Sequence, residues 1–338
     1  MSSGKKVVVF FETNQKEKKY LKKKFDKNFE LRFYSESLDE SNSDLIKDAD
    51  IVSPFIYSEI SGKVMAKAKK LKLISARSTG FNHIDIKYAE KKGISVSNVP
   101  YYGENTVAEH TFALILALSR NVHKAYVRTI RNDFALEGLQ GFDLKGKTLG
   151  VIGAGSIGVH VIKIAKGFGM KVIASDAKPN HILEELLDFK YVTLEELLKG
   201  SDIITLHCPY NKFTHHLINM NNINLVKKGT LFINTARNGI IEPGALYYAM
   251  ENNIFGGAGL DVFEGEELLK EENQMLTKNV SVEHLEALLK RNILLRRENV
   301  IITPHMAFDS VEAVERIMDT TSENIKCFLE GKVYHKVI

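Results

Sequence analysis

Short runs of apolar residues, each about the length of a β-strand, recur along the chain and alternate with segments of helical periodicity. In the first third they occupy residues 5–11, 29–34, 49–53, 71–76 and 93–98. Further along they occupy residues 147–153, 170–176, 201–207, 229–235, 256–262 and 299–304. Alternation of strands and helices predicts parallel sheets covered by helices. Because these strands are too many for one modest sheet, we expect two α/β domains.

Two helical segments bear on how the domains connect. Residues 103–130 have a strongly apolar middle, which predicts one long helix connecting the domains. A final helix near 309–331 comes so late in the chain that we expect it to pack back on the N-terminal domain. That domain is then discontinuous and consists of residues 1–102 and 308–338. Residues 103–307 form a nucleotide-binding domain inserted into it.

A glycine-rich turn follows the first strand of the inserted domain. Gly153, Gly155 and Gly158 stand in the order G-x-G-x-x-G, and Asp176 ends the next strand. In a βαβ unit the first glycine permits the tight turn, the second lets the backbone approach a pyrophosphate, and the third lets the helix pack closely. The helix N-terminus then faces the phosphates. Asp176 would bind the ribose hydroxyls, which favours NAD, while Lys178 keeps NADP open as the weaker alternative. A glycine-rich turn in some other α/β protein is the structural alternative.

Composition changes this picture little. The 46 Lys and Arg residues and 42 Asp and Glu residues give a net charge of +4, and the two signs are interspersed, so we expect no nucleic-acid partner. The lysine-dense stretch 16–27 predicts the solvated face of a helix. Cys208 and Cys327 lack metal-ligand spacing, so we expect no metal, no disulfide scaffold and a reducing cytoplasm. No apolar stretch has the length of a membrane span. Residues 265–298, rich in Glu, Leu and Lys, predict a helical insertion at the surface.

Seven segments carry a resemblance to a known family. They are RSTGFNHID (77–85), NVPYYGENTVAEHTFALIL (98–116), GVIGAGSIG (150–158), LHCP (206–209), INTARNG (233–239), GLDVFEGE (259–266) and ITPH (302–305). With these motifs in this order, the chain resembles the D-isomer-specific 2-hydroxyacid dehydrogenases, and most closely the branch that acts on D-lactate. The resemblance implies NAD as cofactor and two parallel-sheet domains, Rossmann-like and flavodoxin-like.

The resemblance also implies a catalytic trio of Arg237, Glu266 and His305. The imidazole of His305 would exchange a proton with the substrate oxygen, because histidine titrates near neutral pH. Glu266 would orient that ring, with Glu264 and Glu267 as close rivals for the role. Arg237 would clamp the substrate carboxylate and polarise the carbonyl. Taken singly, an arginine in a loop, a glutamate in an acidic stretch and a histidine after proline are ordinary surface residues.

Further site residues follow from the same resemblance. Besides the glycines and Asp176, the implied cofactor contacts are Ser156, Ile157, Cys208, Pro209, Thr214, Thr235, Ala236 and Asp261, the last through the nicotinamide carboxamide. Backbone N–H groups near Thr79 and Gly80 would hold the substrate carboxylate. Tyr102 would hydrogen-bond the substrate, with Tyr101 as the alternative. Phe308 would wall the side-chain pocket, although Phe308 and Phe55 are equally explained as core residues.

The expected reaction is reversible reduction of pyruvate to D-lactate by NADH. Other enzymes of the same class remain open, acting on 2-hydroxyisocaproate, on hydroxypyruvate or glyoxylate, or on phosphoglycerate. An NAD-sensing binding protein resembling the corepressors of this fold is an alternative from another class. If His305 is not the acid, His207 or His110 is the next candidate. The apolar middle of 103–130 carries more apolar surface than one nucleotide domain can cover, which predicts a homodimer, and the resemblance implies dimerisation through the same region. Asn238 departs from the family, which usually has glycine after the catalytic arginine.

Overall fold

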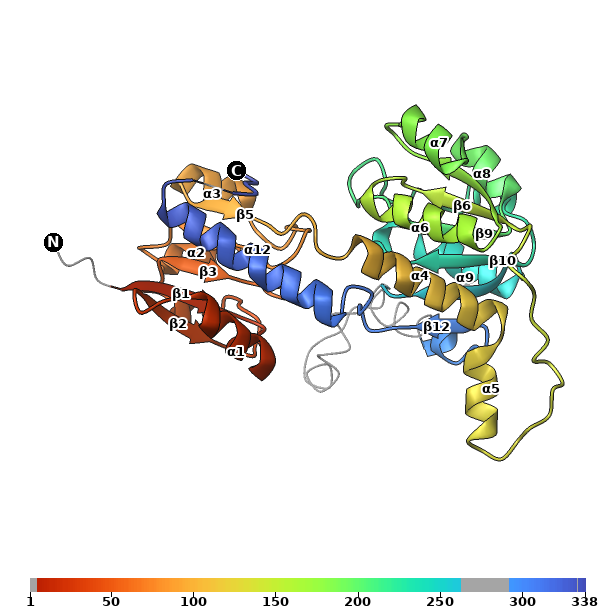
Figure 1. The fold of residues 1–338 in the computed structure, drawn as a ribbon, viewed down its shortest axis with the longest axis horizontal. Helices are drawn as coiled ribbons and strands as arrows, with labels where there is room; N and C mark the ends of the chain where they lie inside the picture. Colours follow the sequence, from red (N-terminus) through yellow and green to blue (C-terminus); the bar gives the residue numbers. More distant parts are fainter. Residues whose placement is uncertain (1–4, 263–291, 333) are drawn as a thin grey trace. The chain divides into compact units, whose positions relative to one another are not determined.

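The computed structural model describes residues 5–262, 292–332 and 334–338. This part of the chain forms two compact units. The first consists of Met1–Tyr102 together with Ser310–Ile338, and the second of Gly103–Asp309. The second boundary therefore follows Asp309, where the sequence predicts a boundary after residue 307. Each unit contains one parallel sheet with helices, so the predicted fold class is confirmed (Figure 1).

The first unit has a five-stranded parallel sheet in the order β2-β1-β3-β4-β5, which is the flavodoxin-like order. Its strands are β1 (Lys6–Phe10), β2 (Phe29–Phe33), β3 (Ile51–Ser53), β4 (Leu73–Ser75) and β5 (Ser95–Ser97). Its helices are α1 (Gln15–Lys24), the 3-10 turn η1 (Ser43–Ile46), α2 (Gly62–Lys67), α3 (Ile86–Lys92) and α12 (Val311–Leu329). The lysine-rich stretch forms α1, in which only Leu21 is buried, so its lysines are solvated as expected.

Helix α12 explains why the last residues belong to the first unit. Met318 and Ile325 of α12 pack in one core cluster with Phe10 of β1, Leu21 of α1 and Leu73 of β4. Tyr20 of α1 also donates a hydrogen bond of 2.9 Å to the Asp319 carboxylate. The final helix therefore packs back on the N-terminal sheet, as its place in the sequence predicts.

The second unit has a seven-stranded parallel sheet in the order β12-β11-β10-β9-β6-β7-β8. Its strands are β6 (Thr148–Ile152), β7 (Lys171–Ser175), β8 (Lys190–Tyr191), β9 (Ile203–Leu206), β10 (Thr230–Asn234), β11 (Phe255–Leu260) and β12 (Val300–Ile302). Its helices are α4 (Glu104–Ser119), α5 (Val122–Thr129), α6 (Ser156–Gly167), α7 (His181–Leu187), α8 (Leu194–Gly200) and α9 (Pro243–Glu251), with 3-10 turns η2 (Ile223–Leu225) and η3 (Asn238–Ile240). The strand order reverses between β6 and β9, and open α/β sheets bind ligands at that point.

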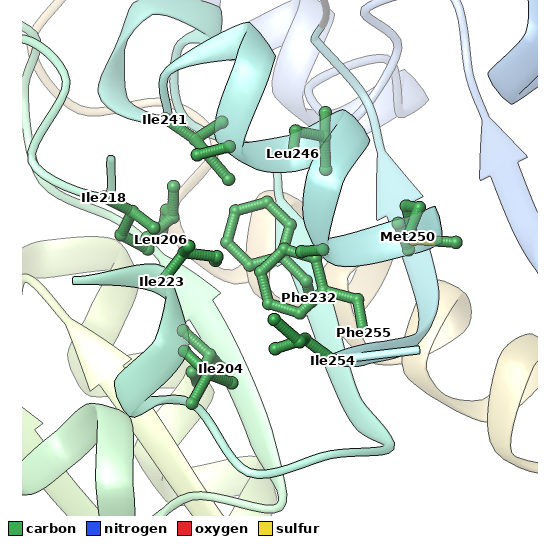
Figure 2. Packing of buried hydrophobic residues seen from close by; sticks show 14 of the residues in the cluster. Ile204, Leu206, Ile218, Ile223, Phe232, Ile241, Leu246, Met250, Ile254 and Phe255 are labelled. Atoms are coloured by element: carbon green, nitrogen blue, oxygen red, sulfur yellow. The ribbon is translucent and has the colours of Figure 1, made fainter. Parts of the chain in front are cut away.

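A dense apolar cluster supports the strands that carry the candidate catalytic residues. The rings of Phe232 on β10 and Phe255 on β11 stack at 4.7 Å between centroids (Figure 2). Ile204 and Leu206 of β9 and Met250 of α9 belong to the same cluster (Figure 2). Close packing on this face holds β9, β10 and β11 in register, so their carboxyl ends form a rigid edge.

The expectation of a single helix over residues 103–130 is wrong. Helix α4 ends at Ser119, Asn121 has a left-handed backbone with φ of 52°, and α5 begins at Val122. Both helices belong to the second unit. The sequence pattern misled because the apolar periodicity continues across the break.

The reason for expecting a dimer through α4 is also wrong. Its apolar residues Val107, Phe112, Ile115 and Leu118 are buried, and α4 packs against α6, β10 and β11 of its own unit.

Three other expectations concern single segments. The sequence does not predict strand β8, because a strand of two residues carries no recognisable hydrophobic pattern. The proposed insertion at 265–298 lies outside the described residues except for its last seven. Among the helices that the structure describes, none combines the length and apolar character needed to cross a membrane.

Candidate active site

The glycine turn after β6 has the geometry that the motif predicts. Gly153 has a left-handed φ of 94°, and a Cβ there would lie 2.6 Å from the backbone nitrogen of Cys208. A Cβ on Gly158 would lie 2.1 Å from the Gly153 carbonyl oxygen. Any side chain at these two positions would separate β6 from the end of β9 or from α6. These glycines are therefore required by backbone packing.

The N-terminus of α6 is open in the way that a phosphate site requires. Gly155 is the N-cap, and no side chain caps the helix there. A Cβ built on Gly155 would have no atom within 4 Å among the described residues. Ser156 and Ile157 form the first turn, and Ser156 is exposed. Free N–H groups and the positive end of the helix dipole face this space, so the residues present fit a dinucleotide pyrophosphate.

Asp176 lies directly after β7 and is tied to the glycine turn. Its Oδ2 accepts a hydrogen bond of 2.8 Å from the Ala154 N–H, and its Oδ1 accepts one of 2.8 Å from the Lys178 N–H. Lys178 thus supports the carboxylate through its backbone. The acid is held beside the turn, as expected for a group that binds the ribose of NAD.

We predict that Asp176→Asn lowers the preference for NADH over NADPH by about tenfold or more. The wild-type carboxylate would repel a 2′-phosphate, and juxtaposed like charges cost on the order of several kcal/mol. The asparagine keeps an oxygen for the Ala154 N–H and gives up only the exposed bond from the Lys178 N–H. Asp176→Ala removes both bonds and should weaken binding of both cofactors. The measurement is kcat/KM with each cofactor. Equal values in the wild type would contradict the role of Asp176.

The loop after β9 carries three of the expected cofactor residues. The Thr214 hydroxyl donates to the Pro209 carbonyl at 2.6 Å and accepts from the Asn211 N–H at 2.8 Å, so it closes this loop. Burial, together with the nearby Asp176 charge, raises the pKa of the Cys208 thiol to about 11. The Cys208 thiol therefore stays protonated at neutral pH and acts as a small apolar group.

Arg237 projects from a tight turn after β10. The side chain of the buried Asn234 organises this turn, because its Oδ1 accepts from the Ala236 N–H at 3.0 Å and its Nδ2 donates to the Arg237 carbonyl at 2.9 Å. The Arg237 guanidinium is half-buried and donates to the Ala236 carbonyl at 2.7 Å. Asn238 accepts from the next backbone N–H at 2.8 Å, so it fits the turn in place of the usual glycine.

The buried hydroxyl of Thr235 faces helix α4. Its Oγ1 lies 3.1 Å from the Thr111 Oγ1, so the hydroxyl has a partner inside its own unit. The structure therefore ties Thr235 to α4.

Asp261, directly after β11, is fully buried and anchors the neighbouring loop. Its Oδ1 accepts from the Thr303 hydroxyl at 2.5 Å and from the Met306 N–H at 2.9 Å. Its Oδ2 accepts from the Ala307 N–H at 2.9 Å, and His110 Nε2 of α4 lies 3.5 Å from Oδ1. These partners use most of the carboxylate's acceptor capacity. Asp261, which the resemblance assigns to the nicotinamide, therefore also holds the loop after β12 in place.

The electrostatics of Asp261 follow from these contacts. Burial alone would raise the pKa of the Asp261 carboxyl, but the hydrogen bonds from His110, Thr303 and two backbone N–H groups outweigh it and hold the pKa below its usual range. The side chain is consequently an anion at neutral pH. Sequence reasoning missed His110 and Thr303 as its partners, although a lone histidine in the apolar helix 104–119 was a signal.

His305 lies within the loop that Asp261 anchors. Its backbone N–H donates to the Asp261 carbonyl at 3.0 Å and to the Thr303 carbonyl at 2.9 Å. The backbone of His305 is left-handed, with φ of 53°, a conformation that non-glycine residues adopt at some cost and often at functional sites. The imidazole is half-buried at the carboxyl edge of the sheet. Phe308, also half-buried, follows in the same loop, whereas Glu266 lies outside the described residues.

The two alternative acids are poorly suited to proton transfer. Burial lowers the pKa of His207 to about 3, and its Nε2 lies 2.8 Å from the Thr205 Oγ1, so the ring stays neutral near pH 7. His110 Nε2 lies 3.2 Å from the Thr303 Oγ1 and is engaged in supporting Asp261. Reduction of a ketone needs a ring that carries the proton to be donated, so His207 and His110 are weaker candidates for the acid than His305.

The expected substrate residues of the first unit lie in a braced loop after β4. The Thr79 hydroxyl donates to the Val99 carbonyl at 2.8 Å, and the Ser78 hydroxyl donates to the Gly80 carbonyl at 2.6 Å. Among the described residues, the backbone N–H groups of Thr79 and Gly80 have no hydrogen-bond partner. Two adjacent N–H groups of this kind suit a carboxylate. Tyr102 is half-buried, and its carbonyl accepts from the Arg316 Nε at 2.6 Å, whereas Tyr101 is exposed.

Comparison with known proteins decides the family. The family model described as D-isomer specific 2-hydroxyacid dehydrogenase, NAD binding domain, matches residues 112–307. A 2-hydroxyacid dehydrogenase homolog of Haemophilus influenzae is 38% identical over 334 residues, which cover 98% of each chain. The chain belongs to this family. It is accordingly an NAD-dependent oxidoreductase, and its second unit contains the NAD-binding domain.

Two further relatives of this 2-hydroxyacid dehydrogenase are described as D-lactate dehydrogenases. The Escherichia coli enzyme is 36% identical over 328 residues, which cover 95% of this chain and 96% of that one. The solved structure of D-lactate dehydrogenase from Aquifex aeolicus, complexed with NAD and lactic acid, is 38% identical. It matches with a TM-score of 0.86 over 96% of each chain. The dehydrogenase therefore shares both its fold and most of its length with these enzymes.

Proposed function

We propose that this 2-hydroxyacid dehydrogenase interconverts pyruvate and D-lactate. The observation that carries the proposal is that Arg237 follows β10 and His305 follows β12 at the carboxyl edge of the second unit's sheet, on either side of β11 and its buried Asp261. That pair supplies a carboxylate-binding cation and a proton donor, which are the groups that reduction of a 2-ketoacid needs. Similarity to D-lactate dehydrogenases supports pyruvate as the ketoacid.

In this proposal each group acts on a stated atom of the substrate. The Arg237 guanidinium binds the carboxylate and polarises the C2 carbonyl, and the N–H groups of Thr79 and Gly80 hold the carboxylate oxygens. His305 gives its ring proton to the C2 oxygen during reduction and takes it back during oxidation. Bound NADH supplies the hydride. Glu266 is assigned to orient the His305 ring.

The remaining assignments concern binding. We propose that the N–H groups of Ser156 and Ile157 bind the pyrophosphate and that Asp176 binds the adenosine ribose. The other cofactor contacts are assigned to Cys208, Pro209, Thr214, Thr235, Ala236 and Asp261, with Asp261 acting chiefly through the loop that it anchors. Tyr102 is proposed to hydrogen-bond the substrate, and Phe308 to wall its side-chain pocket. A cytoplasmic location stays a prediction from the sequence.

Initial rates of NADH oxidation on a panel of 2-ketoacids test the function. We expect the highest kcat/KM with pyruvate among pyruvate, 2-ketoisocaproate, hydroxypyruvate, glyoxylate and phosphohydroxypyruvate, and D-lactate as the product. Preference for another ketoacid would reassign the substrate within the family. NADH binding without turnover of any ketoacid would favour an NAD-sensing binding protein.

We further propose that the chain forms a homodimer through α5 and the segment that follows it. Large apolar side chains of this segment are exposed: Val122, Tyr126, Val127, Ile130, Phe134 and Leu136. Phe134 is 74% exposed and Leu136 is 83% exposed, so most of the surface of both side chains is in contact with water. Large exposed apolar side chains gathered along one segment of the chain are typical of an interaction surface.

For this surface we predict that Leu136→Glu shifts the protein from dimer toward monomer. A buried charge without a partner is costly at an interface, so the dissociation constant should rise by about a hundredfold or more. Light scattering at micromolar concentration measures the mass. Ile182→Glu, on the exposed face of α7, is the matched control and should leave the dimer intact. A wild-type protein with the mass of a monomer would contradict the proposal.

A further inference from the structure

The last residues of the chain dock on the edge of the first unit's sheet. Lys336 forms an antiparallel bridge with Ser97 of β5, and the Val337 N–H donates to the Val96 carbonyl at 2.8 Å. The Asn98 N–H donates in return to the His335 carbonyl at 3.2 Å. The side chains of Val337 and Ile338 pack against the apolar core of this unit. The C-terminal tail, residues 334–338, is therefore an integral part of the sheet edge.

A buried amide on α12 links this tail to the sheet. Asn324 is 1% exposed, its Nδ2 donates to the Asn98 carbonyl at 2.9 Å, and its Oδ1 lies 3.1 Å from His335 Nδ1. A carbonyl can only accept, so the amide must turn its NH2 toward Asn98 and its oxygen toward His335. His335 must then carry a proton on Nδ1. The contacts thus define one arrangement of both side chains.

The same chain of hydrogen bonds continues to the candidate substrate loop. The Asn98 Nδ2 donates to the Thr79 carbonyl at 2.8 Å, and the Val99 carbonyl accepts from the Thr79 hydroxyl at 2.8 Å. The Thr79 carbonyl belongs to the peptide whose N–H is that of Gly80. The orientation of that N–H is therefore set by Asn98, which is itself held by Asn324 and the tail.

We propose that Asn324 and His335 are positioning residues for substrate binding, acting through Asn98 on the loop that holds the substrate carboxylate. This inference rests on the proposed function, because it takes Thr79 and Gly80 as the carboxylate donors. It assigns a role in substrate binding to the C-terminal tail, which carries no catalytic motif. Loosening the network reorients the Gly80 N–H and weakens ketoacid binding, while the cofactor groups of the second unit are unchanged.

The test compares variants that break or keep the bond between the tail and Asn324. His335→Leu removes the donor and should raise KM for pyruvate about fivefold, the usual worth of one hydrogen bond, with kcat and the Kd for NADH unchanged. The inhibition constant for oxamate, a carboxylate analogue of pyruvate, should rise in parallel. His335→Asn places an amide nitrogen where Nδ1 lies and should restore both values. Asn324→Asp turns an acceptor toward the Asn98 carbonyl and should raise KM by about tenfold or more.

Lys336→Ala is the matched control, since this exposed tail residue keeps its backbone bridge to Ser97 and should keep the wild-type KM. If Asn324→Asp does not fold, the KM values of His335→Leu and His335→Asn still test the inference. Suppose that the wild type is active and that His335→Leu has an unchanged KM, even if its melting temperature falls. That result overturns the inference about the tail and leaves the proposed function standing. A wild type that reduces no 2-ketoacid overturns the proposed function and this inference with it.

Discussion

Replacing His305 with alanine is expected to lower kcat for pyruvate reduction by about 10²–10⁴-fold, the usual worth of a positioned acid–base group. The reason is that the imidazole supplies the proton that the C2 oxygen takes up as the hydride arrives. The loop should survive, because Asp261 holds it through the N–H groups of His305, Met306 and Ala307. Stopped-flow and steady-state rates with saturating NADH measure the loss.

The pH profile distinguishes a proton donor from a residue that merely shapes the site. In the wild type, pyruvate reduction should fall and D-lactate oxidation should rise as pH increases, because reduction takes up a proton and oxidation releases one. The alanine variant should lose both limbs while its Kd for NADH stays near the wild-type value. His181→Ala, at an exposed histidine of α7, is the control. Near-native turnover with an unchanged profile would remove His305 as the acid.

Asp261→Asn should have the second largest effect, lowering both activity and stability. Either orientation of the asparagine amide points its NH2 at a backbone N–H, of Met306 or of Ala307. The buried mismatch should lower the free energy of unfolding by about 2–4 kcal/mol. The displaced loop should lower kcat by about 10²-fold, because a misplacement of about 1 Å can cost that much. Urea denaturation and steady-state rates measure the two effects.

The stability difference between wild type and Asp261→Asn should depend on pH in one direction. The folded-state pKa of Asp261 is lowered, so its carboxylate contributes full stability above the unfolded-state pKa of about 3.9. That contribution is lost as pH falls through the lower pKa of the folded state. The difference should therefore be constant from neutral pH to about pH 4 and narrow below it.

Asp309→Asn is the matched control for this experiment, since Asp309 is exposed in the same loop and should change neither quantity. If Asp261→Asn kept wild-type stability and kcat, the buried carboxylate would not be what holds the catalytic loop. A loss of stability without a loss of kcat would show that Asp261 stabilises the fold but does not position His305 for catalysis.

The amino-acid sequence by itself determined the fold class, the glycine turn of the nucleotide-binding unit and the candidates for the catalytic residues. An apolar run bounded by glycine and polar residues is a pattern within one short segment. The strands that end at Asn234, Leu260 and Ile302 could therefore be recognised from their own residues. The G-x-G-x-x-G spacing likewise follows from contacts within one βαβ unit, where Gly153 and Gly158 leave no room for a Cβ. The family motifs made Arg237 and His305 the catalytic candidates, and each lies three residues past the end of such a strand.

Only the tertiary structure decided which side chains these groups depend on. Asp261 meets His110 and Thr303, and Asn324 meets His335 and Asn98, through pairings between distant segments that no local period encodes. The break at Asn121 and the burial of α4 were hidden for the same reason. An apolar helix face looks alike whether its own domain or a second copy covers it, and only the packing of α4 on α6, β10 and β11 distinguishes the two.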